Sequence, residues 1–155
     1  MNGFALFVAS FGYVGFFPIA PGTAGSLAAL VLFAGVRWVG MPAFELGMIA
    51  LVMVAGIWAA NGAERVLGLK DPGPIVIDEV LGMLITLAVI PVSLTGILVG
   101  FLLFRVFDVM KPFPAARIEH LSGGFGVMLD DAVAGLYAHL VLRVCMWWVP
   151  SWLIA

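Results

Sequence analysis

Two pairs of adjacent carboxylates interrupt long apolar runs of this sequence. Asp78 and Glu79 lie between IVI and VLGM, and Asp130 and Asp131 lie between VML and AVAGL. A charged side chain inside hydrocarbon costs about 2.5–3.5 kcal/mol on insertion scales, so such residues usually have a partner or a function. Carboxylates that lie close together must bind protons or cations, and all-oxygen ligand sets select hard ions such as Mg²⁺, Ca²⁺ or Mn²⁺. The two pairs therefore indicate a divalent metal site.

A third motif, FRVFDVMKP, combines cations with an acid. Arg105, Asp108 and Lys111 are three residues apart and so share one face of a helix. Lys and Arg bind phosphate oxygens, and Asp binds metals. Mg²⁺ bound by two or three carboxylates beside a phosphate is the usual arrangement for phosphoryl chemistry. The alternatives are a structural ladder of salt bridges for this motif and a helix-capping role for Asp130.

The segment PIAPGTAGS, residues 18–26, comes directly before an apolar helix that we expect to begin near residue 26. A helix N-terminus has unsatisfied N–H groups and partial positive charge, which suit an anion such as phosphate. Thr23 and Ser26 are therefore candidate phosphate ligands. The simpler interpretation is a plain turn in which one of these two residues caps the helix.

The composition is typical of a helical integral membrane protein. The chain of 155 residues is 64% hydrophobic and 10% charged, with a mean hydropathy of +1.20, whereas a soluble domain has about 25% charged residues. Its length fits one domain, residues 1–155. No basic patch indicates nucleic acid, the single Cys145 excludes an intrachain disulfide, and the first apolar stretch lacks the basic residues of a cleavable signal peptide.

Five helix-length apolar segments predict five membrane spans. They cover about residues 26–40, 44–60, 75–90, 94–110 and 127–149. Residues 3–17 are shorter than the roughly 20 residues that a span needs, so they predict an interfacial or re-entrant segment, or a helix packed across the bundle. The expected fold is an all-α integral membrane protein, a small bundle of about five transmembrane helices with this N-terminal segment.

Five crossings would place the polar loops on one side of the membrane. The N-terminal segment and the loops at 61–74 and 111–126 share that side, which contains Arg65, Lys70, Lys111 and Arg117. The positive-inside rule then puts these loops in the cytoplasm. The same end of the bundle would collect six carboxylates, Asp71, Asp78, Glu79, Asp108, Asp130 and Asp131. Gly82 and Gly135 each follow an acid by four residues and would let the helices approach closely.

Four segments together resemble the phosphatidylglycerophosphatase A family. They are PGTAGSLAAL (21–30), IVIDEVLGM (75–83), FRVFDVMKPFP (104–114) and GGFGVMLDDAVAGLYA (123–138). The resemblance covers nearly the whole chain, in order and with matching spacing. It implies a Mg²⁺-dependent phosphatase of the bacterial inner membrane that converts phosphatidylglycerol phosphate into phosphatidylglycerol and inorganic phosphate at the cytoplasmic face. It places Asp78, Glu79, Asp108, Lys111, Asp130 and Asp131 in the family's polar motifs without assigning their roles.

The chemistry of the residues suggests those roles. The expected metal ligands are Asp78, Glu79, Asp108 and Asp131, with Asp130 as the second choice, and all five acids are expected to take part in catalysis. Arg105 and Lys111 would bind the phosphate of a phospholipid that remains in the bilayer, assisted by Thr23 and Ser26. The nucleophile would be an activated water, and an aspartyl-phosphate intermediate is the alternative.

Two other functions of membrane proteins also use carboxylates. A cation or proton transporter would also use intramembrane carboxylates, but it would need acids near the membrane midplane and polar groups on both sides. A CDP-alcohol phosphatidyltransferase would need an Ala-Arg dipeptide between spaced aspartates, and Ala116–Arg117 lies in a different context.

Overall fold

The computed structural model describes residues 2–118 and 120–155. Every regular element in this part of the chain is a helix, which confirms the predicted all-α class. The elements are α1 (Asn2–Ala9), the 3-10 turn η1 (Val14–Phe16), α2 (Pro21–Trp38), α3 (Pro42–Leu67), α4 (Ile77–Leu87), α5 (Leu94–Met110), α6 (Ala115–Ile118), α7 (Gly124–Trp148) and α8 (Pro150–Leu153). Glu119, in the expected loop at 111–126, lies outside the described residues.

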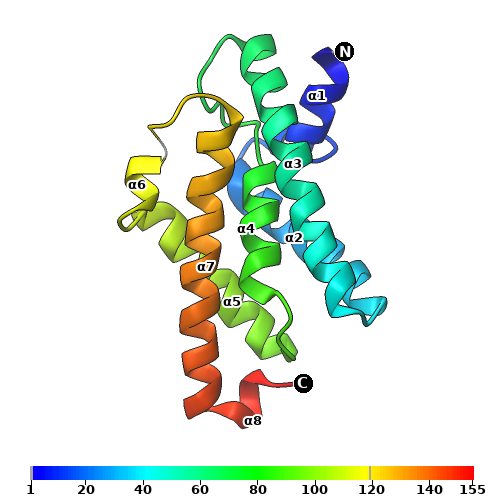
Figure 1. Ribbon diagram of the computed structural model, residues 1–155, viewed down its shortest axis with the longest axis vertical. Coiled ribbons are helices and arrows are strands. Elements are labelled where there is room, and N and C mark those ends of the chain that lie inside the picture. Colours follow the sequence, from blue (N-terminus) through cyan, green and yellow to red (C-terminus); the bar gives the residue numbers. More distant parts are fainter. Residues whose placement is uncertain (1, 119) are drawn as a thin grey trace.

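Helix α4 lies at the centre of the molecule (Figure 1). It packs against α2, α3, α5 and α7, and most of its side chains are buried. Val80, Leu81, Met83 and Leu87 are completely enclosed. A helix that is apolar on all sides needs neighbours on all sides. The four surrounding helices therefore cover α4 together with the acid pair in its first turn.

Two helices are long and apolar enough to cross a membrane. They are α3, with 26 residues, and α7, with 25. Helices α2 and α5, with 18 and 17 residues, are not both long enough and apolar enough to be counted with them. Helix α4 has only 11 residues. Eleven residues rise about 16 Å, roughly half of the 30 Å hydrocarbon core. The expected span at 75–90 is thus a shorter helix that cannot cross a membrane alone.

Helix α2 begins earlier than the sequence suggested. It starts at Pro21, where the missing N–H costs nothing because the first helical N–H groups have no intrahelical partner. Ser26 therefore lies inside the helix, and its hydroxyl donates a hydrogen bond to the Gly22 carbonyl at 2.8 Å. The N-cap residue is Ala20, which makes no side-chain cap. The expectation that Thr23 or Ser26 caps this helix was wrong.

Other helix ends follow local signals in the sequence, although α3 continues seven residues beyond the expected span at 44–60. Gly68 ends α3 in the left-handed conformation, with φ of +67°, and donates its N–H to the Glu64 carbonyl. Helix α5 covers the predicted residues, and α7 begins three residues before its predicted start. The N-terminal segment and the connections after α3 and α5 lie at the same end of the molecule (Figure 1), as the expected topology requires.

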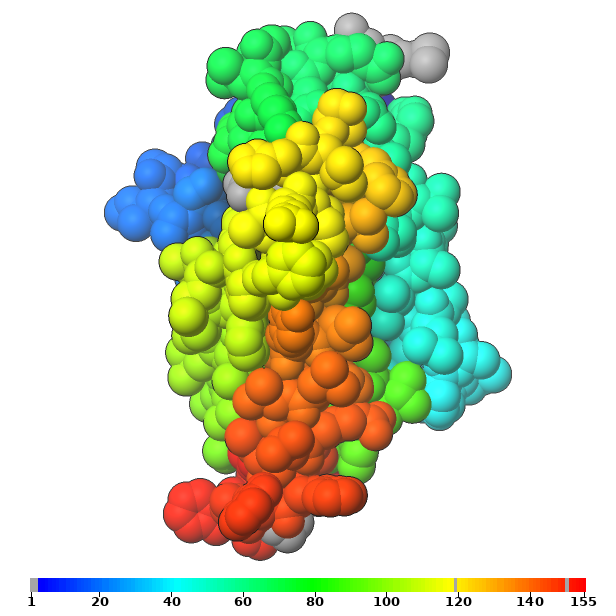
Figure 2. All heavy atoms as spheres, turned by 60° about the vertical axis from the view of Figure 1, so that its left-hand side comes forward, coloured from blue at the N-terminus to red at the C-terminus, as the bar shows by residue number. Residues whose placement is uncertain are grey.

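The N-terminal segment supports the loop that leads into α4. Helix α1 packs against α3, and the Ala9 carbonyl accepts a hydrogen bond from the Val76 N–H at 3.0 Å. A side chain at Gly15 would collide with the Pro74 carbonyl. The segment around η1 projects from the body of the molecule (Figure 2), and it exposes Tyr13, Phe16 and Phe17. Tyr, like Trp, is enriched at membrane interfaces.

Glycines bring α4 and α7 into close contact, as the sequence predicted. A Cβ atom at Gly135 would meet the backbone of Gly82, and a Cβ atom at Gly82 would lie 2.9 Å from the Asp131 carbonyl. Thr86 of α4 reinforces this contact, because its hydroxyl donates a hydrogen bond to the Gly135 carbonyl of α7 at 3.4 Å. The close approach of the two backbones places the acid pairs of α4 and α7 beside each other.

We expect Gly135→Ala to lower the thermal unfolding temperature of the protein in detergent. The added methyl group would overpack the contact between α4 and α7, at a cost of about 1–3 kcal/mol. Gly47→Ala is the matched control because a Cβ atom at Gly47 meets nothing within 4 Å, and it should leave stability unchanged or raise it. Equal unfolding temperatures for the two variants would contradict the role given to this contact.

Candidate functional site

A polar cavity of about 370 Å³ lies at the end of the molecule where α2 begins and α5 ends. Its walls come from α2, α4, α5, α7 and the loop before α4. It is lined by all six carboxylates that were expected to converge, Asp71, Asp78, Glu79, Asp108, Asp130 and Asp131. Arg105 and Lys111 line it as well. The structure therefore brings together the acids and cations that the sequence singled out.

Three of these carboxylates form a compact cluster. Asp78, Glu79 and Asp131 each contribute an oxygen, and these oxygens lie within 4.8 Å of one another. Asp78 is 8% exposed and Asp131 is 3% exposed. Asp78 Oδ1 and Glu79 Oε2 are buried and have no hydrogen-bond partner among the described residues. Buried charged oxygens without partners are strongly unfavourable, so this set fits a bound hard cation.

The two acid pairs are used differently. Asp78 and Glu79 both reach the cluster, although neighbouring helical residues point about 100° apart. Asp131 joins them, whereas Asp130 turns to Lys111 and accepts a hydrogen bond from its Nζ at 2.8 Å. Asp130 Oδ1 also accepts from the Asp131 N–H at 3.0 Å. The Asp130–Lys111 ion pair therefore connects the start of α7 with the end of α5.

Arg105 connects the cluster with α2 and α5. Its Nη1 lies 2.7 Å from Asp108 Oδ2 and 3.9 Å from Glu79 Oε1. The same nitrogen donates a hydrogen bond to Ser26 Oγ at 3.3 Å. Asp108 thus lies beside the three-carboxylate cluster in an ion pair within α5. Part of the predicted ladder forms, since Arg105 pairs with Asp108 while Lys111 pairs across to α7.

The start of α2 forms another wall of the cavity. Ala20, Pro21 and Gly22 line it, and a Cβ atom at Gly22 would collide with Glu79 Oε1. Thr23, a candidate phosphate ligand, is not among the described residues that line the cavity. The hydroxyl groups of PGTAGS were the expected ligands, and a role for Gly22 was not predicted. The signal was the glycine, which allows a carboxylate to lie against the helix backbone.

A second buried ion pair lies at the opposite end of the molecule. Glu45 is 5% exposed and lies 3.3 Å from Arg37, and it accepts a hydrogen bond from the Val89 N–H. Arg37 also donates to the carbonyls of Leu87 and Ile90. These bonds tie α2 and α3 to the C-terminal end of α4. The ion pair thus stabilises the contacts between these helices, and its two residues do not line the acid cavity.

Comparison with known proteins identifies the family. The family model described as phosphatidylglycerophosphatase A matches residues 7–146. The chain belongs to this family. Its membership confirms the resemblance seen in the sequence and the predicted enzyme class, a phosphoric monoester hydrolase. No solved structure matches the chain.

Three curated relatives carry two different names. The phosphatidylglycerophosphatase A of Haemophilus influenzae is 40% identical over 134 residues, which are 84% of this chain and 81% of the relative. That of Escherichia coli is 34% identical over 143 residues, 91% of this chain and 82% of the relative. A Bacteroides thetaiotaomicron protein is 38% identical over 141 residues, 86% and 87% of the two chains, and carries the provisional name phosphatidylinositol-3-phosphatase.

We expect Mg²⁺ or Mn²⁺ to raise the thermal unfolding temperature of the purified protein, because a cation would relieve the repulsion among the clustered carboxylates. A ligand at 100 times its dissociation constant stabilises by about 2.7 kcal/mol. Asp131→Asn should remove most of this metal-induced shift. The adjacent variant Asp130→Asn is the control and should retain it, since Asp130 pairs with Lys111 outside the cluster. Equal shifts in the two variants would exclude Asp131 as a principal ligand.

Proposed function

We propose that the protein hydrolyses the phosphate monoester of phosphatidylglycerol phosphate and releases phosphatidylglycerol and inorganic phosphate in a Mg²⁺-dependent reaction. The observation that supports this function best is the carboxylate cluster of Asp78, Glu79 and Asp131, which lies next to Arg105. Metal-binding acids beside a phosphate-binding cation are the parts that phosphoryl transfer needs. The names of the Haemophilus influenzae and Escherichia coli relatives point to the same substrate.

The ligands of the metal would be Asp78, Glu79 and Asp131. Two of their oxygens are buried and without hydrogen-bond partners among the described residues, and oxygen ligands of this type select Mg²⁺ over soft metals. A bound Mg²⁺ would supply Lewis-acid stabilisation of the charge on the phosphate oxygens and would favour ionisation of an attacking water. Asp108, expected as a fourth ligand, would remain in reach at the edge of the cluster.

Arg105 and Lys111 would bind the phosphate group. The contacts of Arg105 with Asp108, Glu79 and Ser26 all use Nη1, and a guanidinium has five N–H donors, so it can also bind a phosphate oxygen. Lys111 presents a single ammonium group that Asp130 orients. Asp108 and Asp130 would then act as positioning residues for the two cations. Ser26 would assist by orienting Arg105.

The substrate would stay in the bilayer during the reaction. We propose a multi-pass protein of the bacterial inner membrane in which α3 and α7 cross the bilayer, and α2, α4 and α5 complete the bundle. Helices α2 and α5 expose large apolar side chains such as Val31 and Leu102, as lipid-facing helices do. The acid cavity would face the cytoplasm, because the last turn of α3, the loop after it and α6, at the same end, carry Arg65, Lys70 and Arg117.

The Bacteroides thetaiotaomicron relative suggests a second candidate substrate, a phosphatidylinositol 3-phosphate. Both lipids present a phosphate monoester on an alcohol, so the acids and cations of the cavity could act on either one. The difference lies in the alcohol that leaves, which is a glycerol in one lipid and an inositol ring in the other. A direct comparison of the two lipids decides between these functions.

We expect the purified protein in detergent micelles to release phosphate from phosphatidylglycerol phosphate in the presence of Mg²⁺ and to stop when a chelator is added. Asp78→Asn should lower the rate by at least about 100-fold, because even residues outside the first metal shell contribute 10–100-fold. Glu45→Gln, at the opposite end of the molecule, is the control for loss of a buried carboxylate. No Mg²⁺-dependent release, or faster release from phosphatidylinositol 3-phosphate, would overturn the proposed substrate.

Arg105→Lys should raise the KM for the lipid about tenfold or more while the protein stays folded. Lys keeps the positive charge but loses the planar set of donors that can bind phosphate and Asp108 together. Arg65→Lys, an exposed change at the same end of the molecule, should leave KM unchanged. The proposed phosphate-binding role fails if Arg105→Lys has the same KM as the unmodified enzyme.

A further inference from the structure

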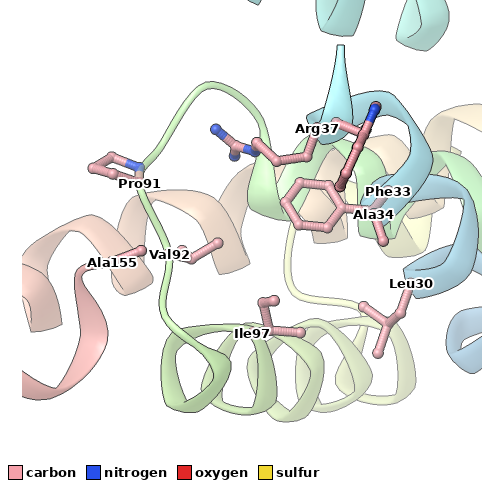
Figure 3. Close-up of a pocket in the computed structure, with 9 residues that line it drawn as sticks. Leu30, Phe33, Ala34, Arg37, Pro91, Val92, Ile97 and Ala155 are labelled. Atoms are coloured by element: carbon pink, nitrogen blue, oxygen red, sulfur yellow. The ribbon is translucent and has the colours of Figure 1, made fainter. Parts of the chain in front are cut away.

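An apolar cavity of about 580 Å³ lies between α2 and α5, toward the end of the molecule opposite the acids. Figure 3 shows Leu30, Phe33 and Ala34 of α2 on one side of this space and Ile97 of α5 on the other. Pro91, in the connection between α4 and α5, lies at its edge. An apolar space of this size could hold part of a hydrocarbon chain.

The apolar cavity and the acid cavity lie along the same pair of helices. Gly22 and Arg105 line the acid cavity, and Leu30 and Ile97 line the apolar one. In each helix the two positions are eight residues apart, which places them near one face. Between the two cavities, the hydrogen bond from Arg105 to Ser26 joins α2 and α5. A molecule that lies along this seam could therefore occupy both cavities.

The spacing of the two cavities matches the dimensions of a phospholipid in one leaflet. From Gly22 to Leu30 the helix rises about 12 Å, and from Gly22 to Phe33 about 16 Å. One leaflet of a bilayer contributes about 15 Å of hydrocarbon, half of the 30 Å core. A lipid whose phosphate lies among the acids would thus place the end of an acyl chain between Leu30 and Phe33.

We propose that the seam between α2 and α5 is the acyl-chain site of the lipid substrate, with the chain end in the apolar cavity. The proposal rests on the proposed function, because it places the phosphate of the same lipid beside Arg105. The length of the acyl chain would then contribute to substrate binding, through residues of α2 and α5 that lie far from the reacting phosphate.

The lining of the cavity favours hydrocarbon over a second headgroup. Arg37 is the charged residue at its edge, and its guanidinium already contacts Glu45 at 3.3 Å and donates to the carbonyls of Leu87 and Ile90. Its charge is therefore compensated, and it does not require an anionic ligand. The remaining side chains of the lining offer apolar surface to a ligand.

A rival location lies on the other side of α2. A groove of about 450 Å³ between α2 and α3 is lined by Ala28 and Phe44 among others. This groove is also apolar, but it faces α3, whereas the acid cavity is lined by α2 and α5. A lipid whose phosphate lies at Arg105 could therefore extend its acyl chain more directly into the apolar cavity between α2 and α5 than into the groove between α2 and α3.

Photo-crosslinking of the unmodified protein would locate the chain. The probe is phosphatidylglycerol phosphate with a diazirine at the end of one acyl chain, presented in lipid nanodiscs without divalent metal. We expect labelling at residues 30–38 of α2 and at Ile97, reduced by an excess of unlabelled phosphatidylglycerol phosphate but not of phosphatidylcholine. Labelling around Ala28 and Phe44, or labelling spread evenly over the lipid-facing surface, would overturn the proposal. Because this readout needs no turnover, absence of hydrolysis would affect the proposed function alone.

Kinetics with two chain lengths provide a second test. Ala34→Trp would fill part of the apolar cavity, so we expect KM for a sixteen-carbon substrate to rise about tenfold, the equivalent of roughly two buried methylene groups. The KM for a six-carbon substrate should not change, since that chain would end before the cavity. Ala28→Trp is the matched control on the other face of α2. A larger effect from Ala28→Trp, or equal effects on both chain lengths, would contradict the assigned site.

Discussion

The carboxylates of Asp78, Glu79 and Asp131 are held together against their mutual repulsion, so the helices that carry them must be fixed in place. Their oxygens lie within 4.8 Å of one another in a largely buried position, where water cannot screen their charges effectively. Such an arrangement forms only if the backbones that carry it are fixed by contacts elsewhere. The glycine contact between α4 and α7 has this role, because Gly82 and Gly135 bring the two helices together immediately below the acids.

The surrounding charges separate two tasks within one cavity. Asp108 and Asp130 pair with Arg105 and Lys111, which gives each cation a fixed direction beside the cluster. In the three-carboxylate cluster, Glu79 lies 3.9 Å from Arg105, at the outer limit of an ion pair, and two of the cluster's oxygens lack hydrogen bonds within the described chain. Acids that orient cations and acids that would bind a metal are therefore distinguished by their partners. The proposed hydrolysis of a phosphate monoester would use both sets of acids.

The two ends of the molecule are stabilised in different ways. At the acid end, α4 enters from a loop that is supported by the N-terminal segment through Ala9 and Gly15. At the opposite end, the pair of Arg37 and Glu45 satisfies backbone groups where α4 stops. The short central helix is thus fixed at both ends by polar contacts and along its length by apolar packing. The position of α4 among its neighbours, rather than its length, therefore determines where its acid pair lies.

Local patterns in the chain were enough to predict the helical class, the extents of α5 and of most of α7, the family resemblance and the convergence of six carboxylates at one end. These features follow from apolar segments and from turns marked by proline and glycine. The partners of individual side chains became visible in the folded chain, where Asp131 joins the cluster while Asp130 binds Lys111, Asp108 pairs with Arg105, and Gly22 accommodates Glu79. The tertiary structure also showed that α4 is too short to cross a membrane alone. The periodicity of a sequence assigns each side chain to a face of its helix. The partner of that side chain depends on how closely the neighbouring helices pack. Residues far away in the sequence determine this packing.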